Sequence, residues 1–102
     1  MSTEEREQLP SYEAMVIVDA GLEEGDIQKA VDRFLSVVTD SGGEVSSVDR
    51  WGVRRFAYEI DHKNEGYYFV TSFQSSPDTV QKLNQTLRIA DEFVRGKILR
   101  PQ

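Results

Sequence analysis

The sequence predicts an α+β domain in which a four-stranded antiparallel sheet carries two helices on one face. Two stretches carry apolar residues at the three- and four-residue spacing of amphipathic helices. Four further stretches have the continuous or alternating apolar character of strands. The order along the chain is strand, helix, strand, strand, helix, strand, and 102 residues leave room for one small domain.

The first strand is predicted at residues 12–18, where the nearly continuous apolar run indicates contacts on both faces. Alternation divides its apolar side chains into two sets: Ala14, Val16 and Val18 on one face, and Met15 and Ile17 on the other. The preceding stretch is acidic and polar. We therefore expect residues 1–11 to form a flexible extension and residues 12–102 to form the folded domain.

The first helix is predicted at residues 24–40. Acidic residues in or near its first turn suit the positive end of the helix dipole, and Gly42 and Gly43 suit its termination. Its apolar stripe consists of Ile27, Ala30, Val31, Phe34, Leu35 and Val38.

A long extended arm is predicted at residues 44–60. The alternation of apolar and polar residues slips near residues 48–52, which predicts a bulge or strong twist there. The polar residues 61–66 are expected to form a turn. The returning strand is predicted at residues 67–73, which are rich in aromatic and β-branched side chains. These segments together form a β-hairpin.

The second helix is predicted to begin after Ser76, a capping residue, with Pro77 at the first helical position. Its buried stripe consists of Val80, Leu83, Leu87 and Ala90. The last strand is predicted at residues 93–100, and Pro101 ends it.

This order of elements matches the ferredoxin-like βαββαβ fold. Right-handed crossovers place both helices on one face of the sheet and leave the other face open. Apolar side chains mixed with cations suit a binding face better than a solvent face. The residues predicted on the open face are Met15, Ile17, Arg55, Tyr68, Val70, Arg95 and Lys97.

The formal net charge is −6, and it is unevenly distributed along the chain. Residues 1–49 carry 3 Lys and Arg against 12 Asp and Glu, or −9, and residues 50–102 carry 9 against 6, or +3. This asymmetry fits either a basic side that faces a polyanion or an uneven distribution of solvated charge. The chain has neither cysteine nor a long apolar run, so we expect a soluble cytoplasmic protein.

Side chains suited to catalysis are scarce. The one histidine, His62, lies in a predicted turn, and cysteine is absent, so we expect no metal site. The glycines are dispersed and do not form a phosphate-binding loop. The paired acids Glu23-Glu24 and Asp91-Glu92 lie at predicted helix ends, where they fit dipole compensation better than acid–base chemistry. We expect a binding protein that has no cofactor and is not an enzyme.

The densest basic cluster consists of Arg50, Trp51, Arg54 and Arg55. Guanidinium groups pair with phosphate oxygens in a fork geometry, and an indole can stack on a base. The alternatives are packing at the sheet margin for the indole and protection of a strand edge for the arginines. The further candidate RNA-binding residues are Arg88, which also suits a helix C-terminus, Arg95 and Lys97.

Residues 52–60, Gly-Val-Arg-Arg-Phe-Ala-Tyr-Glu-Ile, resemble the signature of the bacterial small-subunit ribosomal protein six family. Residues 12–17 resemble the opening strand of that family, and residues 87–89 resemble its closing segment. The resemblance extends over about residues 12–100 in unbroken order. Phe56 stands where the family has leucine, which concerns core packing, and Asp61 stands where a basic or small residue is usual.

The resemblance implies the ferredoxin-like fold and a structural role in the small ribosomal subunit. It also implies binding to the central domain of small-subunit ribosomal RNA, jointly with small-subunit protein eighteen, on ribosomes in the cytoplasm. The alternative is a ferredoxin-like regulatory or ligand-binding domain that dimerises through its open face. The candidate residues for burial against a protein partner are Met15, Ile17, Tyr68 and Val70.

Overall fold

The structure is a computed structural model that describes residues 9–60 and 62–101. Within these residues the elements follow the predicted order: β1 (Ser11–Asp19), α2 (Glu24–Asp40), β2 (Glu44–Ile60), β3 (Lys63–Gln74), α3 (Pro77–Ile89) and β4 (Phe93–Leu99). The strands form one sheet in the order β2-β3-β1-β4, and every pair of neighbours is antiparallel. The predicted ferredoxin-like α+β fold is confirmed.

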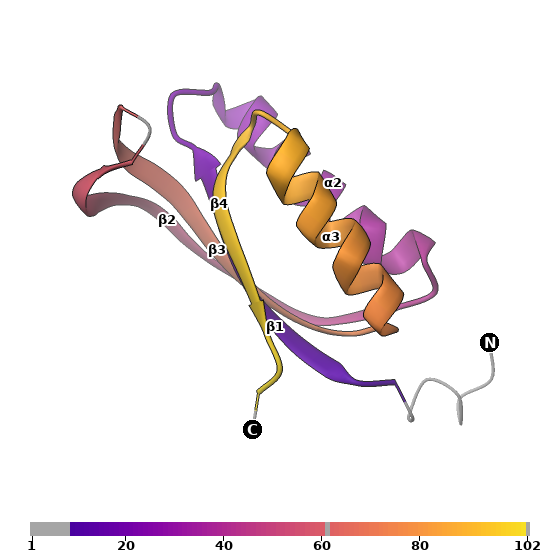
Figure 1. Cartoon of the computed structure of the whole chain (residues 1–102). Coiled ribbons are helices and arrows are strands. Elements are labelled where there is room, and N and C mark those ends of the chain that lie inside the picture. Colours follow the sequence, from indigo (N-terminus) through magenta and orange to yellow (C-terminus); the bar gives the residue numbers. More distant parts are fainter. Residues whose placement is uncertain (1–8, 61, 102) are drawn as a thin grey trace.

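The molecule has two layers, with α2 and α3 side by side on one face of the sheet (Figure 1). The helical stripes predicted from the sequence face this sheet, because their small and branched side chains pack against those of β1 and β3. Phe34 of α2 lies at the centre, with its ring edge-on to Phe69 at 5.7 Å and to Phe93 at 6.4 Å. The buried core consists of Tyr12, Ala14, Val16, Val18, Ala30, Val31, Phe34, Val38, Phe69, Phe73, Leu83, Ala90 and Phe93.

The central strand β1 alternates as predicted. Ala14, Val16 and Val18 are fully buried beneath the helices, whereas Met15 on the opposite face is 40% exposed. Ile17 shares the face of Met15 but is only 8% exposed. The face of the sheet away from the helices is therefore partly filled by side chains of the sheet itself.

The predicted irregularity in β2 is confirmed by a register shift between Arg50 and Gly52, where Gly52 has a φ of 81°. The register also shifts between Val45 and Ser47 and between Arg55 and Ile60, which the sequence pattern does not indicate. Each extra residue in one strand of a ladder reverses the facing of the side chains that follow it. The faces of β2 therefore cannot be assigned by simple alternation.

The hairpin turn is shorter than predicted. β3 begins at Lys63, four residues before the predicted start, and Lys63 pairs with Ile60 of β2. Main-chain hydrogen bonding extends the ladder through polar residues that lack the side-chain signature of a strand. His62 has a φ of 64° in this turn and lies fully exposed, 3.3 Å from Glu59 through Nδ1. Asp61 lies outside the described residues.

Ser76 precedes α3 as predicted, but its hydroxyl does not cap the helix. The hydroxyl lies 3.4 Å from Thr79 Oγ1, and it is the carbonyl of Ser76 that accepts the Thr79 amide at 3.1 Å. Pro77 begins the helix, as predicted. The prediction of a serine side-chain cap is wrong because a neighbouring hydroxyl competes for it.

Most of the expected flexible extension, residues 1–11, lies outside the described residues. Ser11 belongs to β1, and the Pro10 carbonyl accepts the backbone amide of Ser75 at 3.2 Å. β4 ends at Leu99, one residue before its predicted end.

Replacing Gly66 with alanine is expected to lower the free energy of unfolding by about 1–3 kcal/mol, because it overpacks a filled site. Gly66 is buried in β3, and an added Cβ would collide with Ile17 Cγ2 and lie 2.9 Å from Phe56 Cζ. Urea denaturation measures the change. The matched control is Gly25→Ala in α2, where an added Cβ meets nothing within 4 Å. Equal stability of the two variants would contradict the predicted close packing at Gly66.

Candidate nucleic-acid and partner interface

Strand pairing aligns side chains in rows on the face of the sheet away from the helices. Met15 stands between Val70 of β3 and Lys97 of β4, and Ile17 stands between Tyr68 and Arg95. Residues that stand opposite each other in an antiparallel ladder point to the same face. With the β2 side chains described below, the open face includes the apolar, aromatic and cationic side chains of Met15, Ile17, Trp51, Arg54, Phe56, Tyr68, Val70, Arg95 and Lys97 and the acidic side chains of Glu13 and Asp49.

An aromatic group lies at the β2 side of the open face. The rings of Trp51 and Tyr68 are nearly parallel, with an angle of 11° and centroids 6.3 Å apart, and Phe56 meets Tyr68 edge-on at 6.2 Å. The guanidinium carbon of Arg54 lies 5.9 Å from the centre of the Trp51 ring. The Trp51 indole also donates a hydrogen bond to Asp49 Oδ2 at 3.2 Å. These contacts hold the Arg54 cation at the rim of the aromatic group.

The basic cluster predicted on β2 is divided between the two faces of the sheet. Arg54 pairs with Gly66 and contacts Trp51, so it lies on the open face, whereas Arg55 pairs with Glu65. The predicted placement of Arg55 on the open face is wrong. The bulge between Arg50 and Gly52 reverses the facing of the side chains that follow it in β2. Arg54 therefore lies on the open face, where Arg55 was expected.

Arg50 lies on the helix side of the sheet. It pairs with the buried Phe69, and its Nη1 donates a hydrogen bond to Gln28 Oε1 of α2. Arg88 lies exposed near the end of α3, in the helical layer. Of the predicted RNA-binding residues, the structure gathers four on the open face, Trp51, Arg54, Arg95 and Lys97, and separates three from them, Arg50, Arg55 and Arg88.

The four predicted partner residues share the open face but differ in accessibility. Met15 is 40% exposed, Tyr68 and Val70 are half-buried, and Ile17 is nearly covered. Ile17 therefore forms part of the floor of this surface, and Met15 projects most from it. The side chain that the sequence interpretation missed is Phe56, which lies beside Ile17 and Tyr68 rather than in the core. The signal for this placement is Gly66, which leaves the space that Phe56 occupies.

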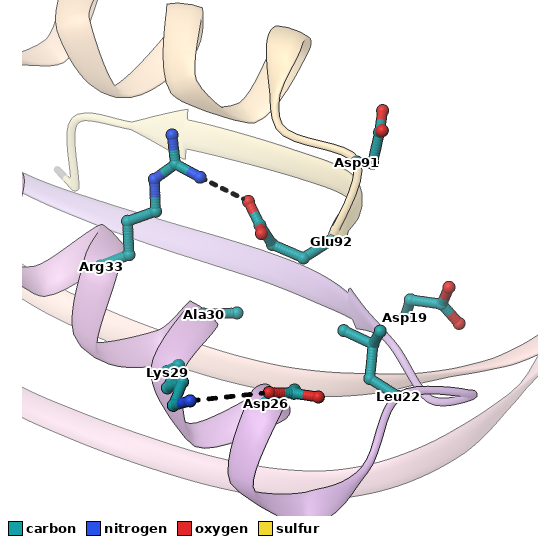
Figure 2. A pocket seen from close by; sticks show the side chains of 8 residues that line it. All are labelled: Asp19, Leu22, Asp26, Lys29, Ala30, Arg33, Asp91 and Glu92. Carbon is teal, nitrogen blue, oxygen red and sulfur yellow. Dashed lines mark hydrogen bonds and ion pairs between the residues drawn. The ribbon is translucent and has the colours of Figure 1, made fainter.

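An acidic hollow of about 400 Å³ lies beside α2, between this helix and the chain just before β4 (Figure 2). The Arg33 guanidinium points toward Glu92, with Nη1 2.7 Å from Oε1, and Lys29 Nζ lies 3.9 Å from Asp26 Oδ1 (Figure 2). Asp19, at the end of β1, pairs instead with Lys63 at 3.7 Å. Three of the acids at this hollow therefore have cationic partners, so its lining is an ion-paired surface.

Replacing Arg33 with methionine is expected to lower the free energy of unfolding by about 0.2–1 kcal/mol, which is the usual value for exposed ion pairs. The Arg33–Glu92 pair joins α2 to the chain just before β4, and both side chains remain partly in water. Lys29→Met, which removes the longer local pair with Asp26, serves as the control and should have a smaller effect. Chemical denaturation at low and high salt measures both. A loss that does not shrink at high salt would contradict an electrostatic origin.

Within the described ranges, neither helix has the length and apolar character needed to cross a membrane. Over the same residues, the acidic and histidine side chains form no group of three or more that could hold a metal ion.

The two layers, with one sheet face left uncovered by the helices, define a ferredoxin-like α+β domain with an open sheet face. The family model described as ribosomal protein S6 matches residues 11–100, and the chain belongs to this family. This finding confirms the resemblance inferred from the sequence. The chain is accordingly a ribosomal protein of the small subunit and not an enzyme.

Relatives and a solved structure support this assignment. The chain is 44% identical to small ribosomal subunit protein bS6 of Arthrobacter sp. strain FB24 over 91 residues, which are 89% of this chain and 90% of the relative. It is 45% identical to small ribosomal subunit protein bS6 of Streptomyces coelicolor, covering 89% and 95% of the two chains. The crystal structure of 30S ribosomal protein S6 from Thermotoga maritima superposes with a TM-score of 0.87 at 30% identity, covering 92% and 89%.

Proposed function

We propose that this chain binds the central domain of small-subunit ribosomal RNA together with small-subunit protein eighteen, as a structural constituent of ribosomes in the cytoplasm. The observation that carries the proposal is the open face itself. It combines an apolar centre with cations held at its margins, on a sheet whose other face is occupied by the two helices. The proposal assigns the centre to the protein partner and the margins to RNA.

The apolar centre suits a protein partner. Met15 projects into solvent between half-buried Val70 and the stem of Lys97, and Tyr68 lies in the next row. Contiguous apolar surface of this kind is unfavourable in water and becomes favourable when a partner covers it. Ile17 supports the surface from below rather than offering contact area, because it is already nearly covered.

The margins suit phosphate groups. Arg54 lies at the β2 margin, and Arg95 and Lys97 lie exposed on β4 at the other margin. Guanidinium groups donate two parallel hydrogen bonds to phosphate, and the Trp51 ring limits the freedom of Arg54. Arg55 is a further candidate on the same hairpin. Arg88 belongs to the helical layer, so RNA that crosses the open face would not reach it.

The net charge of −6 is compatible with this role if the protein partner is cationic. A cationic partner adds phosphate contacts and is attracted to the acidic chain, so the pair would bind RNA more tightly than this chain alone. Asp49 and Glu13 point to the same face as the cations, which further weakens binding of this chain alone to RNA.

Sedimentation through a sucrose cushion tests the proposed function. The purified chain is mixed with a central-domain RNA fragment, with and without protein eighteen. We expect the chain to sediment with the RNA when protein eighteen is present and to remain largely in the supernatant without it. Failure to sediment with both partners present would overturn the proposed function. Sedimentation of the chain alone as a stable homodimer, without affinity for RNA, would support the dimerising alternative instead.

A further inference from the structure

We propose that a groove between α2 and β2 receives one unpaired nucleotide of the RNA, with its phosphate on Arg50 and its base against an apolar wall. This inference rests on the proposed function and adds a second contact to it, on the side of the sheet opposite the open face. The groove has a volume of about 900 Å³, within the range of about 300–1,000 Å³ of small-ligand sites. The residues that define it in this argument are Gly25, Ile27, Gln28, Arg50, Gly52 and Tyr67.

Arg50 is held in place by a chain of hydrogen bonds. The Gln28 amide nitrogen donates to Asp32 Oδ1 at 2.8 Å, which turns the Gln28 carbonyl oxygen toward the guanidinium of Arg50. Because a guanidinium has five N–H donors, Arg50 retains donors for an anion after this bond is made. A cation whose orientation is already set loses less entropy when it binds phosphate than a free surface arginine does.

The wall of the groove is apolar and partly aromatic. Tyr67 and Ile27 are half-buried and pack against the core, so their exposed sides form a firm surface. Val53 stands opposite Tyr67 in the ladder and is 52% exposed at the rim. A planar base can cover such a surface without requiring a particular sequence, since every base has a π-face.

Two glycines keep the groove open. Both residues line the groove, and a Cβ added at Gly25 or at Gly52 would meet nothing within 4 Å. At Gly52 the positive φ of the bulge disfavours other residues as well. The same irregularity that turns Trp51 and Arg54 to the open face therefore also leaves this rim without a side chain.

Continuity along β2 favours RNA as the occupant. β2 is one of the two edge strands of the sheet, with Arg54 on one face and Arg50 on the other. An RNA strand that passes over this edge can place phosphates on both arginines, several nucleotides apart. Glu24 also lines the groove, where its carboxylate repels phosphate but can accept a hydrogen bond from a base amino group. This arrangement orients the nucleotide with its phosphate toward Arg50 and its base toward α2.

The test compares two variants of the full chain in complex with protein eighteen and a central-domain RNA fragment. Gly25→Phe fills the groove from α2, and Arg50→Met removes the guanidinium while keeping most of the side-chain stem. We expect each variant to weaken RNA binding by at least about fivefold in a filter-binding titration, as the loss of a stacked base or a phosphate contact does. The variant that carries both substitutions should bind RNA with the affinity of whichever single variant binds it less tightly. The reason is that both substitutions disturb the same nucleotide. Gly25→Ala is the matched control and should bind like the unaltered chain.

Thermal unfolding verifies that each variant is folded, and Arg50→Met tests the groove independently if Gly25→Phe is unstable. If the unaltered chain binds RNA and both groove variants bind equally well, the nucleotide site is wrong and the proposed function stands. If the unaltered chain binds no RNA, both fall. If Gly25→Phe instead weakens binding of protein eighteen in the absence of RNA, the groove is a protein contact and the nucleotide assignment is overturned.

Discussion

Replacing Met15 with aspartate is expected to weaken binding of protein eighteen by at least about thirtyfold, because a buried unpaired charge in an interface costs about 2–5 kcal/mol. Met15 is 40% exposed in the free chain, so an aspartate there remains solvated until the partner covers it. The stability of the free chain should therefore change little. Isothermal calorimetry of the purified chain with protein eighteen measures the affinity, and thermal unfolding measures the stability.

The matched control is Ile89→Asp at the end of α3. Ile89 is 65% exposed in the helical layer, so this variant introduces the same charge on a surface that the proposal leaves free. It should bind protein eighteen like the unaltered chain. If Ile89→Asp loses binding of protein eighteen and Met15→Asp retains it, the partner binds the helices and the proposed partner surface is wrong.

Replacing Arg54 and Arg95 together with methionine is expected to weaken RNA binding on the order of a hundredfold, as the loss of two charge-assisted contacts does. Two phosphate contacts fewer should also reduce the slope of log affinity against log salt by about 1.4–1.8. Both arginines are exposed and neither is part of the buried core, so the fold should remain intact. Filter binding with protein eighteen present, over a series of salt concentrations, measures both quantities.

The matched control for the salt series is Lys82→Met with Arg88→Met, which removes two cations from α3. Its slope should equal that of the unaltered chain, because both residues lie in the helical layer. If this control lowers the slope of log affinity against log salt, Arg88 or Lys82 contacts the RNA. An unchanged slope in the variant of Arg54 and Arg95 would remove those two residues from them.

The sequence predicts the layers of this fold well, because burial follows simple periodicities in the helices and in β1. The predicted bounds of α2 agree with the observed Glu24–Asp40, since its apolar stripe and acidic first turn are continuous and a glycine pair follows. β1 also agrees within one residue at each end. In both elements nearly every side chain either packs on the core or faces water, so local pattern and tertiary structure carry the same information.

The candidate site is less predictable, because it depends on register rather than on local pattern. A bulge was expected near residues 48–52, but its effect on facing depends on which residue is extra. Because of this one extra residue, Arg54 lies on the open face and Arg55 on the opposite face. Phe56 fits the same explanation. Its position in the signature suggested a core residue, whereas the shifted strand turns it toward Tyr68 on the open face.

The contact between Arg50 and Gln28 illustrates a second limit of local pattern. The two residues are 22 positions apart and lie on different elements, and both have the composition of ordinary surface residues. Only the packing of α2 against β2 brings them together. The groove beside them is therefore a property of the tertiary fold, and the glycine at position 52 is its one local sign.

Hydroxyl-radical footprinting most directly tests whether the open face is the docking surface. The full chain is oxidised alone and in complex with protein eighteen and the central-domain RNA, and side-chain modification is read by mass spectrometry. We expect strong protection of Met15 and Trp51, which are 40% and 41% exposed in the free chain, and unchanged oxidation of Ile89 on α3. Protection of Ile89 with undiminished oxidation of Met15 and Trp51 would contradict the account.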